Sequence, residues 1–112
     1  MKYLKKYEEL NQGEPEIGDY VILKPNTLIE LTDNFIRNNI GQIKSNRERS
    51  YANYVIKYIN VPEDIIGGFL FYEIENNKKG DVVYLSDRSD IQYYSKNKKE
   101  LELILAANKY NL

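Results

Sequence analysis

The chain of 112 residues contains no cysteine, no histidine and no tryptophan. Without cysteine it has no disulfide, no thiolate nucleophile and no thiolate zinc site. Without histidine it has no Ser-His-Asp triad, no imidazole proton shuttle and no imidazole metal ligand. These absences favour a binding module over an enzyme, and we expect no cofactor and no bound metal.

Long hydrophobic runs are missing as well. No apolar stretch approaches the roughly 18 residues that a membrane-spanning helix needs. Residues 1–9 also lack the apolar segment of a signal peptide. We therefore expect a cytoplasmic protein that has no membrane partner.

Tyrosine is the residue type in excess, with 11 copies. A chain of this length forms one domain, here residues 1–112, and buries roughly two thirds of its unfolded surface. Several tyrosines must therefore enter the core, where each hydroxyl needs a partner. Asn, Lys, Ile and Tyr are all frequent and all have AT-rich codons, which is typical of low-GC bacteria and their phages.

The formal net charge is only −1, but the charges are distributed in blocks. Residues 8–33 and 61–92 are acidic, whereas residues 34–60 are basic. The cations of the basic block are Arg37, Lys44, Arg47, Arg49 and Lys57. A basic middle between acidic flanks is the strongest electrostatic feature of the sequence.

Hydrophobic periodicity and turn residues predict short strands between two helices. A long excursion over residues 27–39 holds one helical turn near 33–38, for which Thr32-Asp33 could form the cap. A further helical turn could follow Pro62. The predicted elements are a helix at 2–10, strands at 17–24, 40–44, 51–59, 69–74, 82–85 and 90–94, and a helix at 97–109.

The strand at 51–59 places Tyr54, Ile56 and Tyr58 on one face, and it pairs with the strand at 40–44 as a hairpin with a basic tip. Asn97 is a good N-cap for the last helix, and Glu100 completes a capping-box pattern. We expect this helix to pack on the sheet through its apolar side chains. Those side chains are Leu101, Ile104 and Leu105.

Three segments carry a resemblance to a known family. They are Gly18-Asp19-Tyr20-Val21-Ile22, Ile40-Gly41-Gln42-Ile43 and Tyr54-Val55-Ile56-Lys57-Tyr58. Their order resembles the opening strands of SH3-like small barrels. The resemblance covers residues 17–94 and implies a small barrel or curled antiparallel sheet. Together with the helices predicted at 2–10 and 97–109, we expect a mainly β, α+β fold with a C-terminal and a short N-terminal helix. The whole chain also resembles small proteins of low-GC Firmicutes and their phages, a likeness that brings no defined activity.

Two arrangements could in principle support catalysis. Carboxylates near strand ends could pair as general acid and base or hold Mg²⁺. They are Glu63, Asp64, Asp87 and Asp90. Ser95 and Lys98 have the spacing of a serine nucleophile and its lysine. We interpret the carboxylates as solvated loop residues and Ser95 as a capping residue, and we assign no catalytic residue.

Recognition chemistry remains, because tyrosine and arginine are enriched at interface hot spots. The predicted partner-binding residues are Lys44, Arg47, Arg49, Tyr51, Lys57, Tyr93 and Tyr94. We expect a non-catalytic protein-binding module of a phage or mobile element, an inhibitor of a host system of the anti-defence or anti-CRISPR type that acts by covering a surface.

Two alternatives stay open. In the first, the basic hairpin binds nucleic acid, with Tyr51, Tyr54 and Tyr58 stacking on bases, although Tyr54 and Tyr58 share a face with Ile56 that suits the core better. In the second, the chain is a phage virion or assembly component. A homo-oligomer is compatible with each of these functions.

Overall fold

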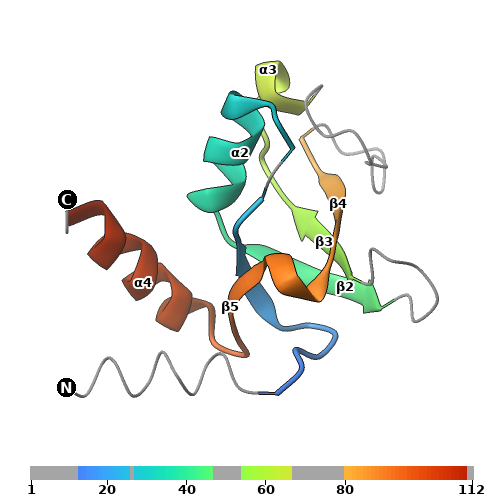
Figure 1. Cartoon of the computed structure of the whole chain (residues 1–112), viewed down its shortest axis with the longest axis vertical. Helices are drawn as coiled ribbons and strands as arrows, with labels where there is room; N and C mark the ends of the chain where they lie inside the picture. Colours follow the sequence, from blue (N-terminus) through green and yellow to red (C-terminus); the bar gives the residue numbers. More distant parts are fainter. Residues whose placement is uncertain (1–12, 26, 47–53, 67–79, 111–112) are drawn as a thin grey trace.

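A computed structural model describes residues 13–25, 27–46, 54–66 and 80–110 (Figure 1). Five strands and two longer helices make up most of these residues. In chain order the elements are β1 (Tyr20–Leu23), α2 (Glu30–Arg37), β2 (Gly41–Asn46), β3 (Tyr54–Tyr58), α3 (Glu63–Ile66), β4 (Val82–Ser86), the 3₁₀ turn η2 (Arg88–Asp90), β5 (Ile91–Ser95) and α4 (Lys98–Tyr110). The fold is thus α+β, as the sequence predicts.

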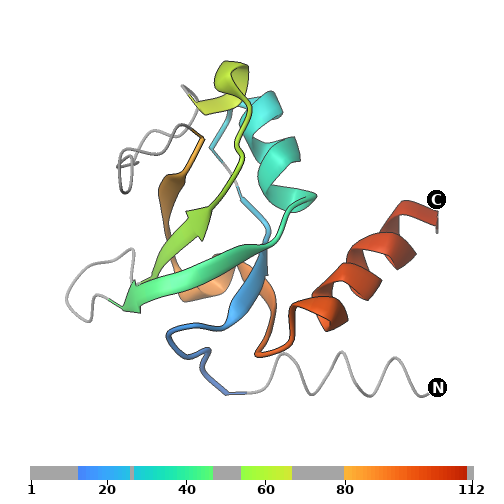
Figure 2. The ribbon, with the colours of Figure 1, turned by 180° about the vertical axis from the view of Figure 1, so that it is seen from behind.

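The five strands form one antiparallel sheet in the order β4-β3-β2-β1-β5. β4 and β5 are therefore opposite edges of the sheet, yet only residues 87–90 join them. A 3₁₀ turn rises about 2 Å per residue, whereas the edges of a flat five-stranded sheet lie about 19 Å apart. The sheet must therefore curl strongly, as Figure 2 shows, and in the described residues it stays open between β4 and β5.

The inner face of the curled sheet carries the main core. Tyr54, Ile56 and Tyr58 all point into it, which confirms the predicted face of β3. Phe35 of α2 closes this core from one side, with its ring 6.0 Å from that of Tyr58 in an edge-to-face arrangement. The core also contains Tyr84 and Tyr94, so tyrosine does supply much of its volume.

A second, smaller cluster fixes α4 on the outer face of the sheet. Leu101 and Ile104 are fully buried there against Ile22 of β1, and Leu105 is half-buried beside them. This confirms the predicted packing face of the last helix. On the outer face, α4 covers the side formed by β1. The side formed by β2 and β3 lies next to α4 (Figures 1 and 2).

The predicted helical turn near 33–38 is wrong at its start, because α2 begins at Glu30. Asp33 does not cap a later turn. Its side chain instead lies in the first turn of α2 and accepts hydrogen bonds from Thr27 N (3.0 Å) and Thr27 Oγ1 (2.6 Å). This contact reaches back six residues, so it lies outside the local pattern that predicted the turn.

Other predictions have mixed outcomes. The helical turn after Pro62 is confirmed as α3. The helix expected at 2–10 and the strand expected at 69–74 lie outside the described residues. Within the described segments, no helix has the length and apolar character needed to cross a membrane.

Candidate binding groove

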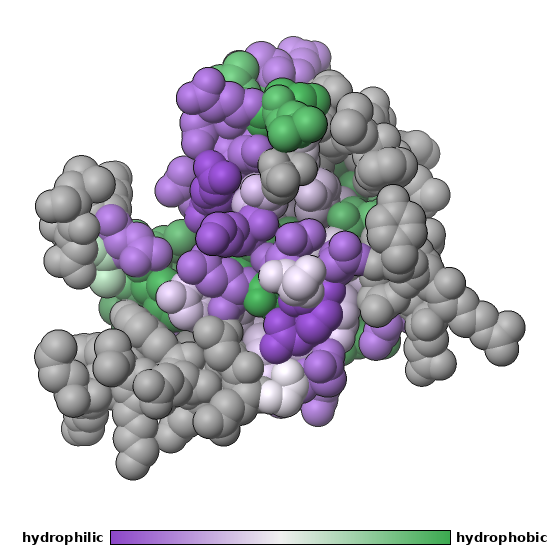
Figure 3. Space-filling model, viewed as in Figure 1, coloured by the Kyte–Doolittle hydropathy of each residue, from purple (hydrophilic) through white to green (hydrophobic). Residues whose placement is uncertain are grey.

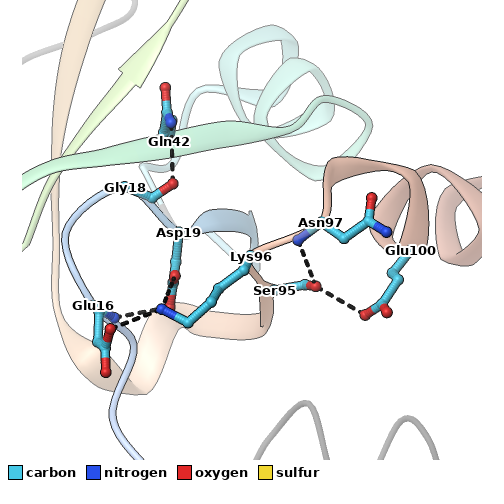
Figure 4. Close-up of polar contacts among 8 residues, drawn as sticks. All are labelled: Glu16, Gly18, Asp19, Gln42, Ser95, Lys96, Asn97 and Glu100. Carbon is cyan, nitrogen blue, oxygen red and sulfur yellow. Dashed lines mark hydrogen bonds and ion pairs between the residues drawn. The ribbon is translucent and has the colours of Figure 1, made fainter.

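A polar cluster around Lys96 lies just before the start of α4 (Figure 4). Lys96 Nζ lies 2.7 Å from Glu16 Oε2 and 3.6 Å from Asp19 Oδ1, while Asp19 Oδ2 accepts from Glu16 N. The ammonium group of Lys96 lowers the pKa of Glu16, and Glu16 in turn raises the pKa of Lys96. The cluster joins the approach to β1 with the end of β5, immediately before α4.

The first turn of α4 has the predicted N-cap but not the predicted capping box. Asn97 Oδ1 accepts from Lys99 N at 3.0 Å, which confirms Asn97 as the N-cap. The expected capping box is wrong, because Asn97 N donates to Ser95 Oγ and Ser95 Oγ donates to Glu100 Oε2 (Figure 4). Ser95 thus connects Asn97 and Glu100, because its hydroxyl oxygen accepts from Asn97 N and its hydroxyl proton is donated to Glu100 Oε2.

Two neighbouring hollows lie between α4 and the β2–β3 side of the sheet. Their volumes are about 130 Å³ and about 310 Å³, and both are lined by Ile40, Ile59 and Lys98. We call the two together the α4 groove. Its other lining residues are Tyr20, Asn38, Asn39, Gly41, Gln42, Lys57, Tyr58, Asn60 and Leu105.

The α4 groove combines apolar surface with positive charge. Ile59 is 55% exposed although it follows a buried strand. Asn60 takes a left-handed conformation with φ of 57° and turns the chain at that point, which asparagine tolerates well. Lys57 and Lys98 supply two cations. The side-chain amides of Asn38, Asn39 and Gln42 already donate to the carbonyls of Asn34, Phe35 and Gly18, so they add polar rather than charged surface to the lining. Such a lining suits a ligand that is partly apolar and carries a carboxylate.

The predicted basic residues divide between the groove and other places. Lys57 pairs with Gln42 across β2 and β3, and both line the groove. Lys44 does not, because the register shifts between Ile43 and Ser45 and leaves Lys44 exposed on the bulge. Arg47, Arg49 and Tyr51 lie outside the described residues.

As predicted partner-binding residues, Tyr93 and Tyr94 were expected to be exposed, and for Tyr94 this is wrong. Tyr94 is only 9% exposed and belongs to the main core, while Tyr93 is half-buried against the α4 cluster. Arg88 contributes to the burial of Tyr94, because its guanidinium lies over the Tyr94 ring, 5.3 Å from the ring centre. Arg88 also donates to the carbonyls of Ile91 and Gly13, so it holds the chain before β1 against η2.

The residues that were weighed for base stacking and for catalysis lie in different places. Tyr54 and Tyr58 are buried in the core, where they cannot stack on bases. Among the four carboxylates weighed as a catalytic pair, Asp90 has a raised pKa because of its burial and because of the charge of Asp87. Glu63 and Asp64 lie exposed on α3. In the segments that the structure describes, no three acidic side chains gather into a site for a metal ion.

Sequence reasoning missed the residues that define the groove. Lys98 was considered only as a partner of Ser95, and Ile40 and Ile59 were assigned to strands. The signal available in the sequence was a large apolar residue, Ile59, next to the turn-forming Asn60, because a residue beside such a turn no longer follows the alternation of a regular strand. The contribution of α4 could not be read from the local sequence.

Comparison of the chain with protein-family models, with curated proteins and with solved structures finds no match. Its function therefore has to be inferred from its own surfaces.

Proposed function

We propose that this protein is a non-catalytic protein-binding module, built as an SH3-like small barrel, that holds an acidic and partly apolar segment of its partner in the α4 groove. One observation carries the proposal: Ile40, Ile59 and Lys98 line two adjoining hollows, and Lys57 adds a second cation to one of them. Clustered cations beside apolar surface select partners by charge and bind them by burial.

The barrel part of the proposal is supported by the topology. β1 pairs with both β2 and β5, and the short link through η2 draws the two edges of the sheet toward each other. Tyr20, Val21 and Ile22 of the segment on which the resemblance to SH3-like barrels rests lie in β1. The groove then lies outside the barrel, between its wall and α4.

The biological role stays part of the proposal. Chain length and AT-rich composition favour a phage or mobile-element protein that inhibits a host system by covering a surface of its target. A virion or assembly component would need the same kind of groove. Nucleic-acid binding through Arg47 and Arg49 stays a separate prediction, and it requires steeply salt-dependent binding of single strands.

Selection from a library of randomised peptides tests the groove directly. We expect the retained peptides to combine Asp or Glu with large apolar residues. Lys98→Glu should weaken their binding about tenfold, because it reverses a charge in the groove. Lys99→Glu is the matched control, since Lys99 is exposed on the same turn of α4 but does not line the groove.

A second variant separates apolar from electrostatic contributions. Ile59→Ser removes exposed apolar surface without opening the core, so it should weaken peptide binding while leaving the free energy of unfolding nearly unchanged. Retention of no peptides, or equal binding by the Lys98→Glu and Lys99→Glu variants, would contradict the proposed function.

A further inference from the structure

A second apolar surface lies at the other end of α2 from the groove. Leu28 is 89% exposed, Leu31 is 62% exposed and Ile29 is exposed between them. We call residues 28–31 the α2 ridge. Asn38 and Asn39, at the far end of the same helix, line the α4 groove.

The ridge is held in a fixed shape. Thr27 is bound to Asp33 through both its backbone N and its hydroxyl, and Thr27 Oγ1 accepts from Ile29 N at 3.2 Å. Leu28 has a φ of 67°, a left-handed conformation that is strained for a leucine. Leu28 thus keeps a strained and clamped backbone while most of its side chain stays exposed, which favours a role in contact with another molecule.

The ridge is bordered by negative charge. Glu30 lies within it, and the exposed Glu63 and Asp64 lie on α3, which contacts α2. Figures 1 and 2 both show α3 next to the start of α2, and Figure 3 shows hydrophobic surface beside hydrophilic surface at this end. The α2 ridge therefore has the chemistry that the α4 groove suits: exposed apolar side chains together with carboxylates.

We infer that the α2 ridge of one copy docks in the α4 groove of a second copy. This inference rests on the proposed function, because it uses the same groove and names its occupant. In such a contact Leu28 and Leu31 face the apolar lining of the groove, and Glu30 approaches the cations Lys57 and Lys98. Opposite charges on the two surfaces give the contact its direction.

The predicted contact is heterologous, since ridge and groove are different surfaces. An open assembly keeps one unoccupied ridge at one end and one unoccupied groove at the other. Copies therefore add head to tail, and the assembly closes into a ring or grows as an open chain. An acidic segment of another protein would compete for the groove and take copies out of the assembly.

Analytical ultracentrifugation of the full chain tests the inference. We expect the mass of the wild type to rise with protein concentration and to fall again at high salt. Leu28→Asn should weaken association about tenfold without unfolding the chain, because asparagine tolerates the left-handed conformation. Lys98→Glu should weaken it to a similar degree, while the exposed-site controls Ser89→Asn and Lys99→Glu should associate like the wild type.

Mixing the two variants gives the decisive measurement. The Leu28→Asn variant keeps its groove and the Lys98→Glu variant keeps its ridge, so an equimolar mixture should form a one-to-one dimer at a concentration at which each variant alone stays monomeric. A monomeric wild type at all concentrations, or a mixture that stays monomeric, would overturn the inference. If library peptides still bind the groove in that case, the proposed function stands; if they do not, both fail.

Discussion

Among the glycines that the structure describes, Gly41 is the one at which an added methyl group should be most harmful. A Cβ built there would overlap Ile56 Cγ2 and lie 2.9 Å from Tyr58 Cζ, and both side chains are fully buried. Gly41→Ala should therefore lower the free energy of unfolding by about 1–3 kcal/mol through overpacking. Urea unfolding of the wild type and the variant measures the difference.

Gly18 provides the contrasting control at the residue scale. Its φ is 95°, and a Cβ there would meet nothing within 4 Å. Gly18→Ala should cost about 1 kcal/mol through backbone conformation alone. If Gly41→Ala is no more destabilising than Gly18→Ala, the close packing of β2 against β3 at this point is wrong.

At the scale of elements, α4 depends on its cap. Asn97→Ala removes the acceptor for Lys99 N and should destabilise the protein by about 1 kcal/mol. Asn97→Asp keeps an acceptor oxygen and should remain close to the wild type. Hydrogen exchange locates the effect, since the amides in the first turn of α4 should lose protection in the alanine variant alone.

The same cap has a consequence for the groove. Lys98 follows Asn97 directly, so fraying of the first turn should displace Lys98 from the lining it shares with Ile40 and Ile59. Asn97→Ala should then weaken binding of library peptides as well as stability, whereas Asn97→Asp should spare both. Unchanged peptide binding by a frayed α4 would show that Lys98 does not act from this position.

At the scale of the whole molecule, local patterns predicted those elements whose contacts are local. The alternation of Tyr54, Ile56 and Tyr58 identified the inner face of β3, and Asn97 identified the start of α4. The start of α2 could not be predicted in the same way. It depends on the side chain of Asp33 reaching back to Thr27.

The candidate site was less predictable than the fold, because its residues come together only in three dimensions. Lys57 was expected to bind a partner, but Lys98 joins it from the end of the chain through the packing of α4. Tyr94 was expected to be exposed, but Arg88 and the main core cover it. Charge and aromatic content indicated recognition, while its location depended on contacts between distant segments.

The buried tyrosines predict how the whole molecule responds to alkaline pH. Burial raises the pKa of Tyr54 and of Tyr84 from 10.0 to about 12, helped by Glu14 at Tyr54 and by Asp90 at Tyr84, and burial raises the pKa of Tyr58 further. The unfolded chain therefore loses these protons first. The contribution of Tyr54 and Tyr84 to stability is complete below pH 10 and is lost as the pH rises through about 12.

Urea unfolding at a series of pH values measures this loss, and ultraviolet absorbance of tyrosinate follows the titration itself. Tyr84→Phe removes one of the titrating groups, so its free energy of unfolding should fall less steeply than that of the wild type between pH 10 and pH 12. Lysines also titrate in this range, but they are the same in both proteins and cancel in the comparison. An equally steep fall in the variant would mean that Tyr84 ionises as easily in the folded chain as in the unfolded one. The main core would then not enclose its hydroxyl.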